Sequence, residues 1–367
     1  MRKYVLFMAA ALMLGGCASH NDGKTESPVR NVIYMIGDGM GLAHLTMLQI
    51  EERYRPTAFD RAQNIALIST YSANNRVTDS AAAGTALATG CKTDNKMLGQ
   101  LPDGQPVVSI LTRARDKGLA TGVVVTCALT HATPAAFYAH VDNRNNEQAI
   151  AADLAECGFD VLIGGSRSLL RAETGDGPTL EAQFAEKGYV VVDTLPDAEA
   201  VHSGRLVGIC GNYHLPSMLE GRGDFLPQAV GKALEILDAN AAKNKSGFAL
   251  MVEGSQIDFE SHTHNTEGIL AEMRDFEKAI GVAMDFADTH PGTLVVVCAD
   301  HETSGMAIPS NNKDFTEAES GVRYVYGTGS HTAAYVPVYI YGAGAECLNG
   351  IMDNTELSKK LQELLIN

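Results

Sequence analysis

Short apolar runs alternate along the chain with longer stretches of helical periodicity. The apolar runs are nearly continuous in Val, Ile and Leu, as strands covered on both faces of a sheet require. They are Asn31–Gly37, Thr121–Leu129, Asp160–Gly165, Phe248–Gly254, Thr293–Asp300 and Val336–Gly342. The amphipathic stretches between them are Gly41–Glu52, Gln148–Cys157, Gln228–Ala242 and Ile269–Thr289. This alternation predicts an α/β fold with a doubly wound, mostly parallel central sheet and helices on both faces.

The N-terminus differs in composition from the rest of the chain. Two basic residues precede the apolar run Val5–Leu14, and two glycines then lead to Cys17. The run is too short to span a membrane, and the pattern is typical of a signal peptide. Because LGGC resembles a bacterial lipobox, we expect residues 1–16 to be removed and Cys17 to carry lipid. Ordinary secretion with an incidental cysteine is the alternative. The polar residues 17–28 predict a tether, and residues 29–367 then form the folded part.

The chain is acidic, with 28 basic and 44 acidic residues and a net charge of −16. Loss of Arg2 and Lys3 with the signal peptide makes the net charge −18. Such a surface repels nucleic acid and anionic lipid. We therefore expect no nucleic-acid binding, and membrane contact only through the lipid anchor of an exported, periplasmic or cell-envelope protein. Local cations must hold any substrate that carries phosphate.

Six cysteines lie beyond Cys17, and their spacing does not select a disulfide pairing, although an exported protein is free to form one. Cys127 and Cys298 lie within apolar runs. We expect these two to be buried free thiols.

Three carboxylates mark the C-terminal ends of predicted strands. Asp38 follows the first strand, Glu253 lies near the end of another, and Asp300 ends a third. For any one of them alone, an acidic cap of the following loop is the favoured explanation. The carboxyl ends of parallel strands meet at one edge of a sheet, so we expect all three to converge there. Converging carboxylates repel one another unless a cation lies among them, which predicts a metal site.

The segment VTDSAAAGTALATG, Val77–Gly90, predicts a tightly packed helix of small residues with Ser80 in its first turn. Unpaired backbone N–H groups and the helix dipole favour an anion at that position. Taken alone, the segment leaves two interpretations open. Ser80 is either a plain N-cap, the commoner role for such a residue, or a hydroxyl directed at a phosphate.

Further segments carry residues suited to metal and phosphate binding. Asp258 and His262 are four residues apart, so on a helix they share one face, as metal ligands must. Mixed carboxylate and imidazole ligands suit zinc, whereas an all-oxygen set suits magnesium. The other candidates in these segments are His131, Thr133, Arg144, His301 and His331.

Together these segments resemble the alkaline phosphatases, in the same order and over most of the mature chain. TDSAAAGT, DFESH and ADHETSG are specific in combination, whereas IGDGMG around Asp38 alone is a weaker signal. The resemblance implies a phosphate monoester hydrolase that acts through a phosphoserine on Ser80 within a catalytic domain over residues 29–367. It also implies that Arg144 clamps the phosphate. A homodimer is implied as well, although only 29 residues separate His301 from His331, which leaves little room for an interface insertion.

The resemblance further implies two zinc ions and a third metal, usually magnesium. The three ligand sets are Asp258, His262 and His331; Asp38, Asp300 and His301, joined by the Ser80 oxygen; and Asp38, Thr133 and Glu253.

Two positions depart from the family pattern. His131 stands where many bacterial members carry an acidic residue, and Phe259 stands where a basic residue often follows Asp258. Loss of a carboxylate weakens a hard magnesium site and admits a softer divalent ion. Phe259 removes a positive partner for bound phosphate. We expect His131, together with Asp79, to lie beside the site and to support its ligands.

Other functions fit the sequence less well. A sulfatase of the same superfamily needs a cysteine-based nucleophile segment, which this chain lacks. A related phosphodiesterase usually has threonine as nucleophile and lacks a clamp like Arg144. A lipoprotein that only binds metal or phosphate has no need for Ser80. The sequence therefore favours the phosphate monoester hydrolase.

Overall fold

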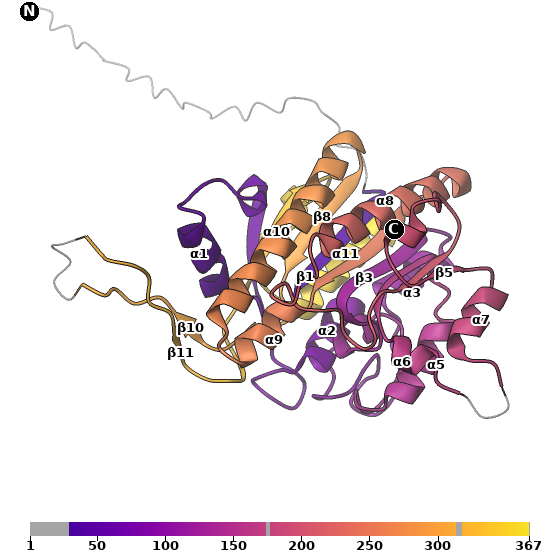
Figure 1. The fold of residues 1–367 in the computed structure, drawn as a ribbon, viewed down its shortest axis with the longest axis horizontal. Coiled ribbons are helices and arrows are strands. Elements are labelled where there is room, and N and C mark those ends of the chain that lie inside the picture. Colours follow the sequence, from indigo (N-terminus) through magenta and orange to yellow (C-terminus); the bar gives the residue numbers. More distant parts are fainter. Residues whose placement is uncertain (1–28, 174–176, 313–317, 367) are drawn as a thin grey trace, which may run out of the picture.

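One ten-stranded sheet runs through the centre of the protein. The computed structural model describes residues 29–173, 177–312 and 318–366 (Figure 1). The strand order is β14-β2-β13-β8-β1-β7-β3-β4-β6-β5. The strands are β1 (Asn31–Gly37), β2 (Asn64–Ser69), β3 (Ala120–Ala128), β4 (Val161–Gly165), β5 (Val190–Val192), β6 (Leu206–Ile209), β7 (Phe248–Gly254), β8 (Thr293–Cys298), β13 (Val336–Gly342) and β14 (Gly350–Asp353).

The sheet is mostly parallel, as predicted. β1 lies at its centre and pairs in parallel with β7 on one side and β8 on the other. Among the described strands of this sheet, only β13 runs antiparallel to its neighbours, β2 and β8. All six predicted strands form, with bounds that differ by a few residues.

Four strands of this ten-stranded sheet were not predicted, and they lie toward its two margins. β2 alternates between buried and partly exposed positions, and β5 has only three residues. Ile351 of β14 is 70% exposed. A strand that is covered on one face, or that is this short, lacks the continuous apolar run by which the central strands are recognised.

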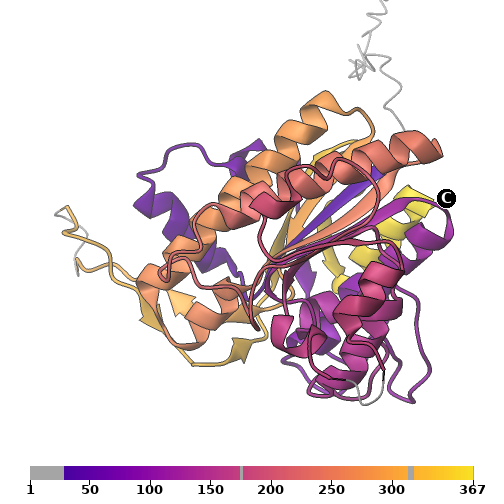
Figure 2. The same cartoon turned by 45° about the vertical axis from the view of Figure 1, so that its right-hand side comes forward.

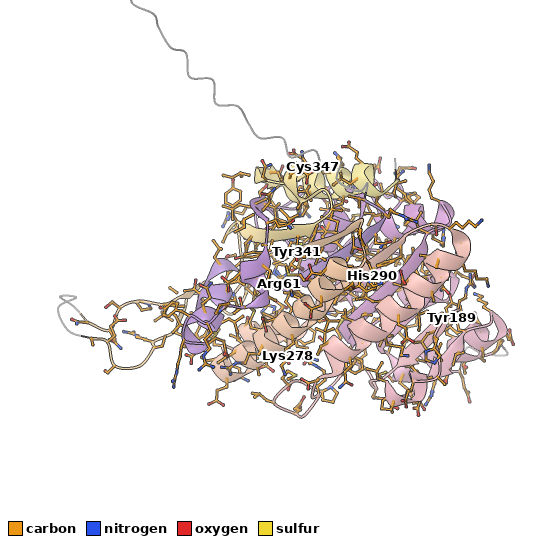
Figure 3. The ribbon with its side chains drawn as sticks, turned by 90° about the horizontal axis from the view of Figure 1, so that it is seen from above. Arg61, Tyr189, Lys278, His290, Tyr341 and Cys347 are labelled. Atoms are coloured by element: carbon orange, nitrogen blue, oxygen red, sulfur yellow. The ribbon has the colours of Figure 1, made fainter. Side chains whose placement is uncertain are left out.

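Helices cover both faces of the sheet, so the doubly wound prediction is confirmed (Figure 2). The two longest, α8 and α10, lie side by side over one face (Figure 3). On the opposite face α2 and α3 pack against α11. The α-helices of the described residues are α1 (Leu42–Glu51), α2 (Ser80–Thr89), α3 (Ile110–Asp116), α4 (Ala132–Ala135), α5 (Glu147–Glu156), α6 (Arg167–Leu170), α7 (Leu180–Glu186), α8 (Phe225–Asn244), α9 (Gln256–His262), α10 (Thr266–Thr289) and α11 (Asn354–Ile366).

Short elements complete the fold. β10 and β11 form an antiparallel pair that projects from the body of the protein, and β9 pairs with β12 (Figure 1). The short strands are β9 (Glu302–Thr303), β10 (Met306–Ala307), β11 (Val325–Tyr326) and β12 (His331–Thr332). The 3-10 helices are η1 (Ala58–Arg61), η2 (Pro196–Ala198) and η3 (Ala345–Cys347).

Helix α10 lies unusually close to the ends of β1 and β7. A Cβ atom at Gly37 would lie 3.0 Å from the Phe276 ring, and one at Gly254 would lie 2.7 Å from it. Both positions therefore need glycine for the Phe276 ring to fit. This packing fixes the ends of the two strands at the edge where Asp38 and Glu253 lie.

Cys91, Cys127, Cys157, Cys210 and Cys298 are free thiols, and Cys127 and Cys298 are buried, as predicted. No helix among the described residues is long and apolar enough to cross a membrane. The predicted signal peptide, Cys17 and the tether fall in residues 1–28, outside the described residues.

Candidate active site

The three carboxylates predicted at strand ends converge. Ile36 of β1 is in register with Glu253 of β7 and with Cys298 of β8. Asp38 and Asp300 each follow two residues beyond that level. The side chains of Asp38, Glu253 and Asp300 are fully buried. The apolar register of three strands therefore brings three negative groups to one edge of the sheet.

Each of these carboxylates has one oxygen without a hydrogen-bond donor, although its other oxygen accepts a hydrogen bond. Oδ1 of Asp38, Oε1 of Glu253 and Oδ2 of Asp300 are buried without a hydrogen-bond partner among the described residues. Burial, with the nearby charge of Asp300, raises the pKa of Asp38 well above its usual range. Burial also raises the pKa of Glu253 to about 7. Bound cations would stabilise the charged forms, so the donor set fits metal ions.

Two imidazoles face each other through their Nε2 atoms. The Nδ1 atoms of His262 and His331 donate to the carbonyls of Gly329 and Thr78, at 2.9 and 2.8 Å. In the neutral rings both Nε2 atoms then present lone pairs, and they lie 3.2 Å apart. Two lone pairs at this distance need a proton or a metal ion near them.

Asp258 completes this group. Its carboxylate lies 3.2 Å from Nε2 of His262, which is four residues later on α9, as the spacing predicted. Nε2 of His331 lies 3.7 Å from the same carboxylate. The hydrogen bond to Asp258 raises the pKa of His262 to about 9, whereas burial lowers the pKa of His331 to about 4. A proton on His262 thus occupies the place of a cation, and metal binding must displace it.

His301 lies at the centre of the site. Its Nε2 atom is 3.1 Å from Oδ2 of Asp300 and 3.4 Å from Oδ1 of Asp38. Its Nδ1 atom lies 3.2 Å from the Thr303 hydroxyl, which itself donates to Asp258. The Thr303 oxygen therefore accepts from Nδ1, and Nε2 is left with a lone pair toward the carboxylates.

Ser80 is the first residue of α2, and Asp79 is its N-cap. Oδ1 of Asp79 accepts from the backbone N–H of Ala82 at 3.0 Å. The Ser80 hydroxyl is therefore not used for capping, and of the two interpretations the plain N-cap is wrong. Its Oγ atom lies 3.3 Å from Nε2 of His301. A Cβ atom at Gly84 would lie 3.0 Å from Ala136, so α2 packs closely on the segment that carries Thr133.

Arg144 reaches the same edge. Nη1 lies 3.4 Å from Oδ2 of Asp79, and Nη2 lies 3.2 Å from Nε2 of His131. The guanidinium is partly exposed, with 21% of the side chain accessible. The arginine is thus in contact with Asp79, the residue before Ser80, and with His131.

The two departures from the family pattern are in contact. The rings of His131 and Phe259 meet edge to face at 5.4 Å between centroids, and His214 packs against both. His214 follows a loop and carries no motif, so its place here could not be predicted from the sequence. Cys127 was expected only as a buried thiol, yet its Sγ atom lies 3.3 Å from Oε2 of Glu253. The only available signal was that Cys127 precedes His131 by four residues at the end of a strand.

Three groups of potential ligands therefore emerge, each with its donor atoms within 4.8 Å of one another. The first group, Asp258, His262 and His331, is the ligand set that the resemblance implies for one zinc. In the second group, Asp258 joins Asp38 and His301 of the expected set. Asp300, the third expected ligand, lies next to His301. In the third group, Glu253 lies with the Cys127 thiol and the His131 imidazole. Thr133, which the resemblance assigns to the third metal, is not in this group, and its hydroxyl lies 3.5 Å from Asp38. The groups are Asp258, His262 and His331; Asp38, Asp258 and His301; and Cys127, His131 and Glu253.

Comparison with known proteins agrees with this geometry. A family model described as alkaline phosphatase matches residues 29–320. The chain belongs to the alkaline phosphatase family. It is 30% identical to alkaline phosphatase 3 of Bacillus subtilis over 93% of this chain and 90% of that protein. It is also 30% identical to the Escherichia coli alkaline phosphatase, over 93% and 87% of the two chains.

Solved alkaline phosphatases have the same fold. The enzyme of the Antarctic bacterium TAB5 has a TM-score of 0.85 at 34% identity, over 92% of this chain and 98% of that one. The Thermus thermophilus enzyme has a TM-score of 0.84 at 25% identity, over 93% and 92% of the two chains. Family, fold and ligand groups together identify this alkaline phosphatase as a metal-dependent phosphate monoester hydrolase.

Substitution of His262 tests the first ligand group. We expect His262→Ala to lose one equivalent of bound divalent metal, because Asp258 and His331 alone offer too few donors for a stable site. His264→Ala is the matched control. His264 lies two residues away, stacks on Tyr326 and donates to the Thr328 carbonyl. Elemental analysis of the purified proteins measures both, and equal metal content in the two variants would remove His262 from the ligand set.

Proposed function

We propose that this alkaline phosphatase hydrolyses phosphate monoesters through a phosphoserine intermediate on Ser80. The observation that carries the proposal is the position of the Ser80 hydroxyl. It begins α2, it is relieved of capping by Asp79, and it lies 3.3 Å from His301 among buried carboxylates. A hydroxyl at this place faces both the N–H groups of a helix N-terminus and the metal ligands.

The metal ligands proposed here are those implied by the family resemblance. Two zinc ions and a third divalent ion, magnesium or a softer ion in its place, would supply the positive charge that lowers the pKa of the Ser80 hydroxyl and stabilises the leaving oxygen. The residues that would hold them form three sets. These are Asp258, His262 and His331 for one zinc; Asp38, Asp300 and His301 for the other; and Asp38, Thr133 and Glu253 for the third ion.

Solved relatives support a third site in this family. Two variants of the TAB5 enzyme, in which a histidine is replaced by aspartate or glutamate, hold magnesium in a site called M3. In this chain the third set includes the buried carboxylates of Asp38 and Glu253. Oxygen ligands of this kind suit magnesium, whereas the neighbouring His131 favours a softer ion.

The reaction proceeds in two displacements at phosphorus. The Ser80 oxygen bonds to phosphorus while the bond to the leaving alcohol breaks, and the alcohol departs with a proton. Water then attacks the phosphoserine, the bond to Ser80 breaks, and inorganic phosphate leaves with the serine hydroxyl restored. The start of α2 holds Ser80 at the site, where its oxygen lies 3.3 Å from Nε2 of His301.

Arg144 is proposed to hold the phosphoryl group. Its planar guanidinium can donate to two phosphate oxygens at once. Asp79 and His131 position it without consuming all of its donors. The same feature argues against a phosphodiesterase, because a diester has one of those oxygens esterified and would leave a donor unpaired. A lipoprotein that only binds metal or phosphate is less well supported, since binding alone does not need the Ser80 hydroxyl.

Replacement of the nucleophile tests the proposal most directly. Ser80→Ala should lose the phosphoenzyme, and its turnover of a chromogenic phosphate monoester should fall by several orders of magnitude. The fold and the metal content should stay unchanged, because the Ser80 side chain does not cap α2. Turnover close to that of the unmodified protein would exclude Ser80 as the nucleophile.

Arg144→Ser separates monoester from diester chemistry. Loss of a charge-assisted pair of hydrogen bonds should raise the barrier for an aryl phosphate by about 2–4 kcal/mol. Hydrolysis of a methyl aryl phosphate should change much less, since that substrate cannot accept hydrogen bonds from both guanidinium donors. The measurement is kcat/KM for the two substrates in both proteins. Equal losses on the two substrates would contradict the assignment of Arg144 as the monoester clamp.

We also propose that the mature protein begins at a lipidated Cys17 and is anchored in the cell envelope. The motive is the LGGC sequence after a short apolar run. Cys17→Ser should abolish labelling by a fatty-acid probe, because only the thiol accepts the lipid. Unchanged labelling of that variant would contradict the anchor. The homodimer also stays a prediction. A measurement of the molecular mass of the purified protein in solution tests it.

A further inference from the structure

A thiol, an imidazole and a carboxylate meet beside the proposed third metal site. The Cys127 sulfur, a ring nitrogen of His131 and a carboxylate oxygen of Glu253 lie within 4.8 Å of one another. They come from different elements. Cys127 lies near the end of β3, His131 is the N-cap of α4, and Glu253 lies near the end of β7. Val125 pairs with Glu253 in the sheet, which places Cys127 just beyond that level.

Two atoms of this group are buried without a partner. Nδ1 of His131 and Oε1 of Glu253 make no hydrogen bond to any described residue. The Cys127 sulfur lies 3.3 Å from the other Glu253 oxygen, and both side chains are fully buried. Unpartnered polar atoms are costly in such a place, and a bound cation would engage both.

Cys298 shows what a structural thiol looks like in the same sheet. It is equally buried, near the end of β8, and its sulfur faces the Tyr34 hydroxyl. Among the described residues it belongs to none of the groups that could hold a metal ion. Burial alone therefore does not bring a cysteine next to a carboxylate and an imidazole, and Cys127 differs from Cys298 in its neighbours.

We propose that Cys127, His131 and Glu253 bind a borderline or soft divalent ion, Zn²⁺ or Co²⁺, with the Cys127 sulfur as a direct ligand. The proposal rests on the proposed function, since Glu253 is shared with the third metal site. On binding, the sulfur–hydrogen bond breaks, the proton leaves to solvent, and a bond from sulfur to the ion forms. Magnesium prefers oxygen ligands, so the thiolate makes this site selective against it.

An ion bound at this site would change the hydrogen bonding of Arg144, the proposed phosphate clamp. Arg144 donates to Nε2 of His131, so the proton of the neutral ring is on Nδ1, where it finds no acceptor. An ion bound at Nδ1 requires the other tautomer, in which Nε2 carries the proton. Nε2 then no longer accepts from Arg144, and the guanidinium is released for phosphate. Occupation of the site thereby prepares the clamp.

Cobalt spectroscopy of the reconstituted holoenzyme tests the proposal. A thiolate bound to Co²⁺ gives an intense charge-transfer absorption in the near ultraviolet, which nitrogen and oxygen ligands do not give. We expect this band in the unmodified protein and in Cys298→Ser, the matched control. Cys127→Ser should lack the band, and Cys127→Ala provides a second variant in case the serine hydroxyl disturbs folding.

Two further measurements use the same preparations. X-ray absorption of the zinc-loaded, unmodified protein should show one sulfur at about 2.3 Å. Magnesium should displace cobalt from the third site of Cys127→Ser at a concentration at least about tenfold lower than in the unmodified protein.

The outcomes distinguish this proposal from the proposed function. Persistence of the band in Cys127→Ser, or a zinc spectrum without sulfur, overturns the thiolate site while phosphomonoesterase activity and total metal content still support the enzyme. Absence of phosphomonoesterase activity in a fully metal-loaded protein overturns the proposed function but leaves the sulfur assignment standing. A protein that takes up no metal at all overturns both.

Discussion

The rest of the structure depends on one electrostatic constraint, the burial of several carboxylates at the ends of neighbouring parallel strands. The apolar register of β1, β7 and β8 brings Asp38, Glu253 and Asp300 together, and Phe276 presses α10 onto the ends of β1 and β7. Without cations these groups repel one another, and burial raises the pKa values of Asp38 and Glu253 above their usual range. The packing of the hydrophobic sheet therefore holds like charges close together at a cost in free energy, and bound cations offset that cost.

The backbone provides most of the orientation in the site. Carbonyls of Thr78 and Gly329 fix the tautomers of His331 and His262, so each ring presents its Nε2 lone pair inward. Asp79 caps α2 and so leaves the Ser80 hydroxyl unused by the helix. These contacts come from loops that are far apart in sequence. They explain why side chains on short segments keep a defined geometry at the edge of a rigid sheet.

The central strands and the convergence of their carboxylates could be predicted from sequence, because continuous apolar runs and parallel pairing determine which ends meet. The marginal strands β2 and β14 could not, since their exposed faces remove that signal. Motif resemblance singled out Ser80 and the residues proposed as metal ligands. It did not reveal Cys127 beside Glu253, because that contact spans 126 positions and depends on the pairing of β3 with β7. The packing of His214 against His131 depends on a loop with no periodic pattern.

The hydrogen bond from His331 to the Thr78 carbonyl also sets an order of assembly, since it joins residues 253 positions apart. A growing chain emerges from its N-terminus, so β1, α2 and β3 can form while the segment with His331 is still being synthesised. The first ligand group closes only when that late segment arrives. Completion of the metal centre therefore belongs to the final stage of folding, and metal loading reports that nearly the whole chain has reached its native arrangement.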